Sequence, residues 1–328
     1  MNSAIPVIDL RAFVAGEPAS REIVAAVDRA AREVGFFVVV GHGVPQKLVE
    51  RAHATARAFF DLDTAIKERY QPPPGGFVGY RGVGSEGLAY SLDQETAADI
   101  KEAFTVARVD REEVPYFTSP IGRIYYPNNP WPIEVQDMEA SWSTLYRAMD
   151  QVAWHLMRIF AAALDLPAPF FDDKIDRNIS CLRAINYPDQ PEPPLPGQLR
   201  AGAHTDYGSL TLLSMEDAPG GLEVHREGDT WETIRVPSDA FVTNVGDLMA
   251  QWTNDAWRSA LHRVANPPRD HEGSSRRQSL VFFHQPNYDA EVVPLPSCCD
   301  SDRPARYART TSGEHLYTKM TKAKNRNV

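Results

Sequence analysis

The segment AGAHTDYGSLTLL, residues 201–213, places a histidine and an aspartate two positions apart at the edge of an apolar strand. Side chains at positions i and i+2 of a strand point to the same face, so His204 and Asp206 can both reach into one cavity. A buried carboxylate without a partner is costly, and a divalent metal would remove that cost. The pair therefore suggests a metal site with a third ligand elsewhere, although pairs of this kind also occur without any metal.

A candidate for the third ligand is His262, which lies in the strand-like segment SALHRVANP. Ala260 and Val264 share its face in period-two alternation. Two histidines and one carboxylate on one face, with open positions opposite, form the arrangement that is typical of non-haem Fe(II) oxygenases.

A second polar pattern follows in RRQSLVFFHQPN, where alternation puts Arg277 and Ser279 on one face together with two large apolar side chains. A buried arginine needs an anionic partner, and its planar guanidinium suits a carboxylate that accepts two hydrogen bonds. The carboxylate of a bound ligand is the simplest candidate. Asp239 or Asp247 of the chain itself is the alternative.

The remaining segments supply the elements that would position these side chains. IPVIDL and FFVVVGHGVP are predicted strands on either side of a helix over residues 20–35, and helical patterns continue to about residue 69. Residues 71–92, rich in Pro and Gly, are predicted to form a long loop. Over residues 133–164, apolar residues recur at alternating intervals of four and three, which predicts a long amphipathic helix. From about residue 178, short strands alternate with turns, which indicates a β-barrel or sandwich supported by helices.

The chain shows no internal repeat, so we expect residues 1–328 to form a single catalytic unit. Within it, we expect a helix-rich N-terminal part (1–177) that packs on the core. The core itself (178–295) would carry the metal and cosubstrate sites, and residues 296–328 would form a C-terminal tail and helix.

Charge and composition exclude several classes of partner. The net charge is −10 and there is no long run of like charges, which argues against nucleic acid and anionic membranes. The start of the chain lacks the pattern of a signal peptide, and no apolar run is long enough to span a bilayer. Three cysteines, two of them adjacent, favour a reducing cytoplasm. These features favour a small-molecule substrate and are silent on oligomeric state.

Taken together, HTDYGSLTLL, SALHRV and RQSLVFF resemble the 2-oxoglutarate/Fe(II)-dependent dioxygenases of the isopenicillin N synthase type. The resemblance covers nearly the whole chain, because IPVIDL, GFFVVVGHGVP, KEAFTV and FVTNVGDLMAQWTNDAWRSALHRV also match, with GHG in place of the usual NHG. It implies a mainly β fold, a double-stranded β-helix (jelly roll) core with supporting helices.

The resemblance also implies roles for individual residues. The expected Fe(II) ligands are His204, Asp206 and His262. Arg277 and Ser279 would hold the distal carboxylate of 2-oxoglutarate, and Tyr187 in AINYP aligns with a family tyrosine that contacts this cosubstrate. The chain departs from plant members at Ile185, where those members commonly carry Asn.

The implied activity uses Fe(II), O2 and 2-oxoglutarate, which is decarboxylated to succinate and CO2, to hydroxylate, desaturate or cyclise a secondary or amino-acid-derived metabolite. An alternative within the family is an oxidase that does not use 2-oxoglutarate, like isopenicillin N synthase or aminocyclopropanecarboxylate oxidase. Two further alternatives are a zinc hydrolase, for which no proton shuttle stands out, and a non-catalytic jelly-roll binding protein. The complete triad together with Arg277 argues against the last.

Candidate substrate contacts come from segments expected near the mouth of the barrel. They are Tyr80 and Tyr90 in the Gly-rich loop, Phe104, Phe283, and Leu316 in the last helix. Each of these residues could equally belong to the core.

Overall fold

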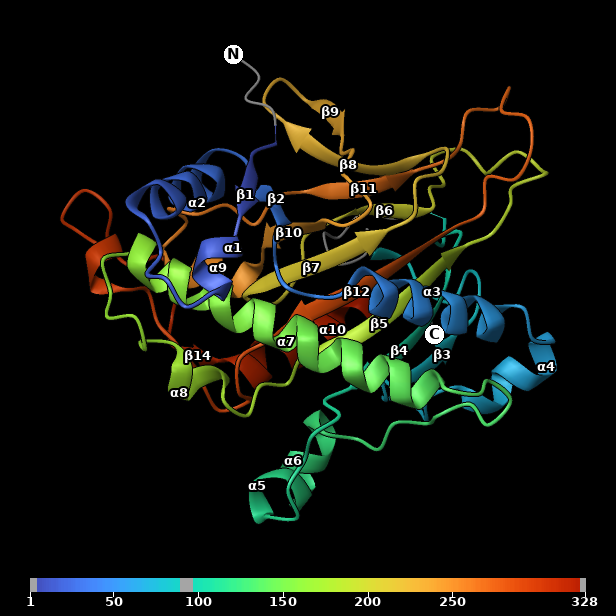
Figure 1. Cartoon of the computed structure of the whole chain (residues 1–328), viewed down its shortest axis with the longest axis horizontal. Helices are drawn as coiled ribbons and strands as arrows, with labels where there is room; N and C mark the ends of the chain where they lie inside the picture. Colours follow the sequence, from blue (N-terminus) through green and yellow to red (C-terminus); the bar gives the residue numbers. More distant parts are fainter. Residues whose placement is uncertain (1–4, 89–96, 325–328) are drawn as a thin grey trace.

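Two β-sheets face each other and form the centre of the molecule (Figure 1). The computed structural model describes residues 5–88 and 97–324 of the chain. The larger sheet has eight strands, in the order β1 (Val7–Asp9), β2 (Phe36–Val40), β10 (Phe241–Val245), β7 (Leu210–Met215), β12 (Arg277–His284), β5 (Cys181–Tyr187), β4 (Glu102–Ala107) and β3 (Gly79–Arg81). The smaller sheet has four strands, in the order β6 (Ala201–His204), β11 (His262–Ala265), β8 (Gly221–Arg226) and β9 (Thr230–Thr233). This is the predicted jelly roll.

Helices flank the sheets and connect them. The longer ones are α2 (Arg21–Glu33), α3 (Gln46–Phe60), α7 (Met138–Ala163) and α10 (Ser312–Lys324). The shorter ones are α1 (Arg11–Val14), α4 (Thr64–Lys67), α5 (Pro115–Thr118), α6 (Pro120–Tyr125), α8 (Asp172–Ile175) and α9 (Asp247–Trp252), with the 3-10 turns η1 (Glu68–Tyr70) and η3 (Pro296–Cys298). A two-stranded ribbon of β13 (Glu291–Val292) and β14 (Thr310–Thr311) precedes α10.

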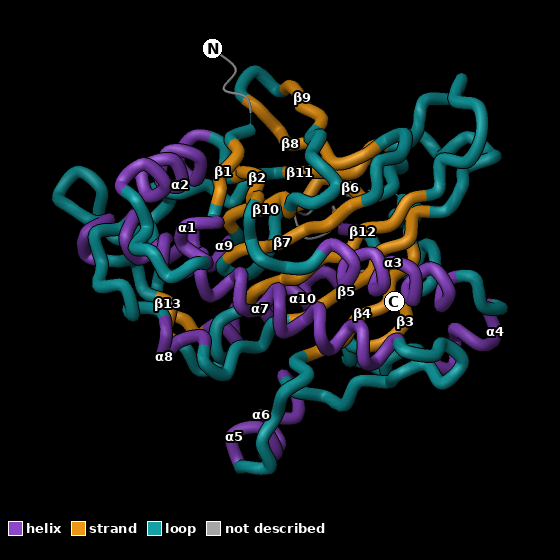
Figure 2. Tube along the Cα trace, in the orientation of Figure 1, coloured by secondary structure: helices purple, strands orange, loops and turns teal. Residues whose placement is uncertain are grey.

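The predicted long helix is confirmed as α7. The apolar residues that recur at intervals of four and three are all buried: Met138, Trp142, Leu145, Met149, Val152, Leu156 and Ile159. Together with α3, this helix contacts the large sheet, and Figure 2 shows both helices lying along it. The helix begins five residues later than predicted, at Met138, because Asp137 has a left-handed φ of 64° and Ile133 is 89% exposed.

The N-terminal part does more than pack on the core. The predicted strands IPVIDL and FFVVV become β1 and β2, and β2 pairs antiparallel with β10, so that Val38 lies opposite Val242. The strands β3 and β4 extend the other edge of the same sheet. The predicted loop over 71–92 therefore contains one strand, β3, which is too short for its alternation to be recognised in the sequence.

Among the residues that the structure describes, no helix is both long and apolar enough to cross a membrane.

Candidate active site

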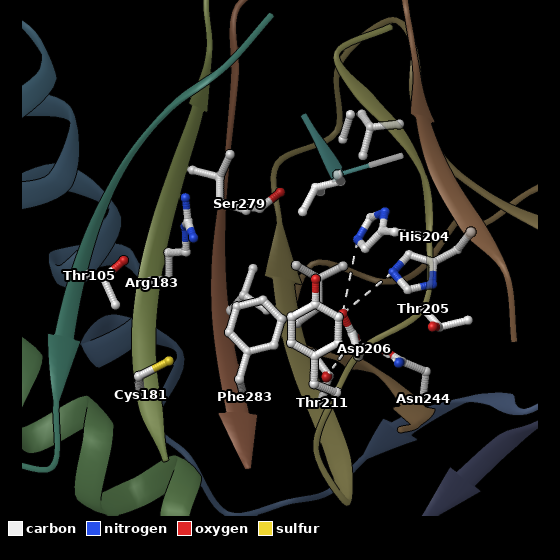
Figure 3. A pocket seen from close by; sticks show the side chains of 18 of the residues that line it. Thr105, Cys181, Arg183, His204, Thr205, Asp206, Thr211, Asn244, Ser279 and Phe283 are labelled. Carbon is white, nitrogen blue, oxygen red and sulfur yellow. Dashed lines mark hydrogen bonds and ion pairs between the residues drawn. The ribbon is translucent and has the colours of Figure 1, made fainter. Parts of the chain in front are cut away.

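A cavity of about 200 Å³ lies between the two sheets. It is lined by alternate residues of β5 and β12, by the ends of β6 and β11, and by residues of α10 (Figure 3). The predicted inward face of β12 is confirmed, because Arg277, Ser279, Val281 and Phe283 all line the cavity.

The three metal-ligand candidates meet at one end of this cavity. His204 closes β6 and His262 opens β11, and the antiparallel pairing of these strands places the two histidines directly opposite each other. The Nε2 atoms of His204 and His262 lie 4.0 and 3.8 Å from Oδ1 of Asp206. The ligand atoms of the three residues all lie within 4.8 Å of one another, so a single ion can be shared among them.

Hydrogen bonds to the backbone fix the orientation of both imidazole rings. Nδ1–H of His204 donates to the carbonyl oxygen of Gly202 at 2.8 Å, and Nδ1–H of His262 donates to that of Ala260 at 3.0 Å. Each ring therefore presents the lone pair of Nε2 towards Asp206. Burial, together with the neighbouring His262, lowers the pKa of His204 to about 3, so this ring is neutral at physiological pH and able to bind a metal.

The carboxylate of Asp206 is held on one side only. Its Oδ2 accepts hydrogen bonds from Thr211 Oγ1 at 2.7 Å and from Asn244 Nδ2 at 2.8 Å, which leaves Oδ1 facing the two histidines (Figure 3). Burial by itself would raise the pKa of Asp206, but the two imidazoles and these two hydrogen bonds lower it. Neither Thr211 nor Asn244 was predicted from the sequence. Thr211 lies on β7 and Asn244 on a separate strand, β10.

Arg277 lies towards the other end of the same wall. Its side chain is buried (2% exposed). Among the described residues, Nε has no hydrogen-bond partner and Nη2 makes a 3.4 Å contact with the carbonyl oxygen of Glu216. Neither proposed internal carboxylate forms an ion pair with it: within the described chain, Asp247 pairs with Lys319 at 2.7 Å and Asp239 forms no such pair. Burial lowers the pKa of the guanidinium below its usual value.

The other predicted cosubstrate residues lie beside Arg277. Tyr187 is opposite it in the register of β5 and β12, with its ring centroid 5.5 Å from the guanidinium carbon. Ser279 lies one step further along the same face and opposite Ile185. The three predicted residues thus form one group in the cavity.

The predicted substrate contacts divide into three cases. Phe283 and Leu316 line the cavity. Tyr80 and Phe104 instead belong to the core against α3: the Tyr80 hydroxyl donates to Glu102 at 2.7 Å, and the Phe104 ring lies 4.6 Å from Phe59. The reason is strand alternation, since the neighbouring Thr105 faces the cavity and Phe104 must face away. Tyr90 lies outside the described residues.

The polar residues that line the cavity without having been predicted include Lys101, Thr105 and Arg183. Arg183 could have been found from the sequence, because it shares the face of Tyr187 in CLRAINY. Lys101 precedes β4 and reaches the cavity only through the tertiary fold.

Two family models match the chain. Residues 5–134 match the model described as non-haem dioxygenase in morphine synthesis N-terminal, and residues 178–286 match the 2OG-Fe(II) oxygenase superfamily.

Similar proteins of named function have related activities. Validamycin A dioxygenase of Streptomyces hygroscopicus subsp. limoneus is 33% identical, over 90% of this chain and 80% of the relative. The 2-oxoglutarate-dependent dioxygenase citB of Monascus ruber is 32% identical, over 89% of this chain and 87% of the relative. These names favour 2-oxoglutarate dependence over the oxidase alternative.

The solved structures agree with the sequence relatives. A full-length protein of Neurospora crassa, solved in complex with alpha-KG, superposes with a TM-score of 0.83 at 27% identity, covering 97% of this chain and 95% of that one. A putative 2OG-Fe(II) oxygenase family protein from Caulobacter crescentus gives a TM-score of 0.81 at 28% identity, covering 98% of this chain and 99% of that one.

Proposed function

Because the chain belongs to the 2OG-Fe(II) oxygenase superfamily, we propose that its metal ion is held by His204, Asp206 and His262. The protein is a 2-oxoglutarate-dependent dioxygenase that oxidises a small molecule. When bound, Fe(II) and 2-oxoglutarate supply the oxidising chemistry: O2 is consumed, 2-oxoglutarate is decarboxylated to succinate and CO2, and the substrate is hydroxylated, desaturated or cyclised.

One observation carries the assignment of the ligands. Oδ1 of Asp206 and both Nε2 atoms converge, whereas the other polar atoms of these three side chains are already engaged in hydrogen bonds. The donor set of two neutral imidazoles and one carboxylate fits a divalent iron and leaves coordination positions open. The protein contributes the orientation of these three side chains towards the metal.

A test of this orientation is the substitution Thr211→Val, which removes one hydrogen bond to Oδ2 of Asp206 and keeps the shape of the side chain. Losing such a supporting contact is expected to weaken Fe(II) binding about 10- to 100-fold. The matched control is Thr243→Val, because the hydroxyl of Thr243 is also buried in the large sheet but has no hydrogen-bond partner. Anaerobic Fe(II) titration compares the two variants, and equal affinities would contradict the role of Thr211.

For the cosubstrate, we propose that Arg277 binds the distal carboxylate of 2-oxoglutarate, with Ser279 and Tyr187 beside it. The support is the buried guanidinium of Arg277, which has no carboxylate partner among the described residues and retains an unpartnered Nε. Burying a cation in this state is unfavourable unless an anion joins it. A dicarboxylate that reaches from the metal to Arg277 would supply that anion.

We further propose that the whole chain acts as one catalytic unit. Each of its three predicted parts contributes to the cavity wall: Thr105 comes from residues 1–177, Arg277 from residues 178–295, and Leu316 from the C-terminal helix. Apolar side chains from these parts would exclude water from the reacting groups. The net charge of −10 and three free cysteines support a small-molecule enzyme of a reducing, cytoplasmic environment, without nucleic-acid or membrane partners.

The decisive test is anaerobic absorption spectroscopy of the purified protein. A visible charge-transfer band is expected only when Fe(II) and 2-oxoglutarate are both present, because it requires the two to be in contact. Zn(II) with 2-oxoglutarate is the matched control, since its filled d shell gives no such band. Stoichiometric Fe(II) binding without any band on addition of 2-oxoglutarate would contradict the proposed arrangement.

A further inference from the structure

More of the charged residues that line the cavity are positive than negative. Among the described residues, three cations (Lys101, Arg183 and Arg277) and one carboxylate (Asp206) line it. The proposed function assigns Asp206 to the metal and Arg277 to the cosubstrate. Lys101 and Arg183 are left without a role in that chemistry.

Arg183 starts from a backbone position well separated from that of Arg277. Tyr187, which lies opposite Arg277, is four residues from Arg183 on β5, or about 13 Å at ~3.3 Å per residue. Across the sheet, Arg183 lies between Thr105 of β4 and Val281 of β12. Figure 3 shows Thr105 and Arg183 on the side of the cavity opposite His204 and Asp206.

The anions that partner these two cations stay outside the cavity wall. Lys101 Nζ donates to Asp99 at 2.8 Å, and Arg183 Nη2 donates to Glu86. Neither Asp99 nor Glu86 is among the described residues that line the cavity, whereas both cations are. In each ion pair, the cation therefore faces the cavity in which a ligand would bind.

The group as a whole also has an excess of positive charge. Arg81 contributes a third cation, with its Nε 3.8 Å from Glu86 Oε1, so that, among the described residues of this group, three cations face the two anions Glu86 and Asp99. Burial would raise the pKa of Glu86, but Arg183, Lys101 and Arg81 together lower it to about 2, so this carboxylate is ionised at neutral pH. The net charge of the group is therefore +1, which one monoanion would neutralise.

Two hydrogen-bonding atoms at this position have no partner within the described part of the chain. Nε of Arg183 and Oγ1 of Thr105 are both buried and unpartnered, and the side chains of both residues line the cavity, Thr105 with 2% of its surface exposed. Buried polar groups are nearly always satisfied in folded proteins, so these two indicate a missing acceptor. An oxygen of a ligand carboxylate could accept from both donors.

Much of the remaining wall is apolar. Its apolar residues include Ile185, Leu213, Val281, Phe283 and Leu316. We infer that the substrate is a small, largely apolar molecule with one carboxylate, which binds Arg183 and accepts a hydrogen bond from Thr105. This inference rests on the proposed function, which reserves Arg277 for 2-oxoglutarate. A cationic group at the same position would raise the local charge to +2 and is disfavoured.

The inference is tested with matched ligands on the protein loaded with Fe(II) and 2-oxoglutarate under anaerobic conditions. The probes are phenylacetate, 4-phenylbutanoate and cyclohexylacetate, each compared with its primary amide and its amine. Ligand-observed NMR gives the dissociation constants. The acids are expected to bind about 10- to 100-fold more tightly than their amides, because they gain charge-assisted hydrogen bonds, and the amines are expected to bind most weakly.

Substitutions then test which residues cause the preference for acids over amides and amines. The double variant Arg183→Gln/Glu86→Gln removes the cation together with its buried partner, so that no unpaired carboxylate remains and the net charge of the group stays at +1. It is expected to reduce the preference for acids about 10-fold, because the charge-assisted hydrogen bond from Arg183 is lost. Thr105→Val keeps the shape and is expected to reduce acid binding several-fold. The matched control is Arg147→Gln/Asp110→Asn, which removes an exposed ion pair between α7 and the segment after β4 and should leave the preference intact.

Failure of this inference can be distinguished from failure of the proposed function. The charge-transfer band with Fe(II) and 2-oxoglutarate is recorded for wild type and for every variant before ligands are added. If the band is present but the wild type binds none of the acids, or binds amides or amines equally well, the inference is overturned while the proposed function stands. A preference of wild-type size in the double variant would also overturn it. Absence of the band in wild type would overturn the proposed function itself.

Discussion

Asp206→Asn is expected to reduce the affinity for Fe(II) by more than 100-fold, beyond the roughly 10- to 100-fold effect of losing a supporting contact, and to abolish turnover. The substitution keeps the size of the side chain, but Thr211 and Asn244 both donate hydrogen bonds to Oδ2. The amide oxygen of Asn would take that position, because only it can accept. The amide nitrogen, which has no lone pair for a metal, would then face the Nε2 atoms of the two histidines.

This prediction has a matched control elsewhere on the chain. His225 and Asp229 also form a histidine–aspartate contact, with Nε2 2.8 Å from Oδ1, but Asp229 is exposed at the surface. Asp229→Asn should therefore bind Fe(II) as the wild type does. Anaerobic calorimetry measures the affinity, and succinate release measures turnover. Fe(II) binding of wild-type strength by Asp206→Asn would refute the assignment of this carboxylate as a ligand.

The second large effect is expected at Arg277, where one substitution should change ligand binding and stability in opposite directions. Arg277→Leu removes the proposed partner of the distal carboxylate, and loss of one member of a buried, hydrogen-bonded charge pair costs about 2–5 kcal/mol. The dissociation constant of 2-oxoglutarate should therefore rise at least ~30-fold. Fe(II) binding should be unchanged, because the metal ligands lie at the other end of the cavity.

In the ligand-free protein, the same substitution should increase the free energy of unfolding. The guanidinium of Arg277 is buried with an unpartnered Nε, and replacing buried ionic groups by apolar ones of similar volume is often stabilising by about 1–4 kcal/mol. Arg276→Leu is the control, since this neighbour pairs at 2.5 Å with Asp61. That variant should bind 2-oxoglutarate normally and gain no stability. Calorimetric unfolding and titration of the charge-transfer band measure both quantities, and an unchanged 2-oxoglutarate affinity in Arg277→Leu would exclude its proposed role.

Much of the local structure could be predicted because it depends on short-range periodicity. The seven apolar residues of α7 share one face in any helix of that sequence, and alternation in RQSLVFF puts Arg277 and Ser279 on one face of any strand. The same argument paired His204 with Asp206, although β6 ends at His204 and Asp206 lies in the segment that follows it. Periodicity does not give the position of an element in the sheet, however, so the strands β3 and β4 were not assigned to the sheet that carries Arg277.

The sequence by itself predicted three candidate metal ligands, two from their spacing and His262 from its strand pattern and the family motifs. It also predicted the inward face of β12 and the jelly roll implied by the family motifs. Only the tertiary structure decided which side chains complete the site. Strand pairing brings His262 opposite His204, brings Asn244 to Asp206, and places Lys101 with Arg183 on the wall of the cavity. The physical reason is that alternation fixes a residue's face within its own strand, whereas its neighbours across the sheet depend on strand order and register, which are set by contacts between residues far apart in the sequence.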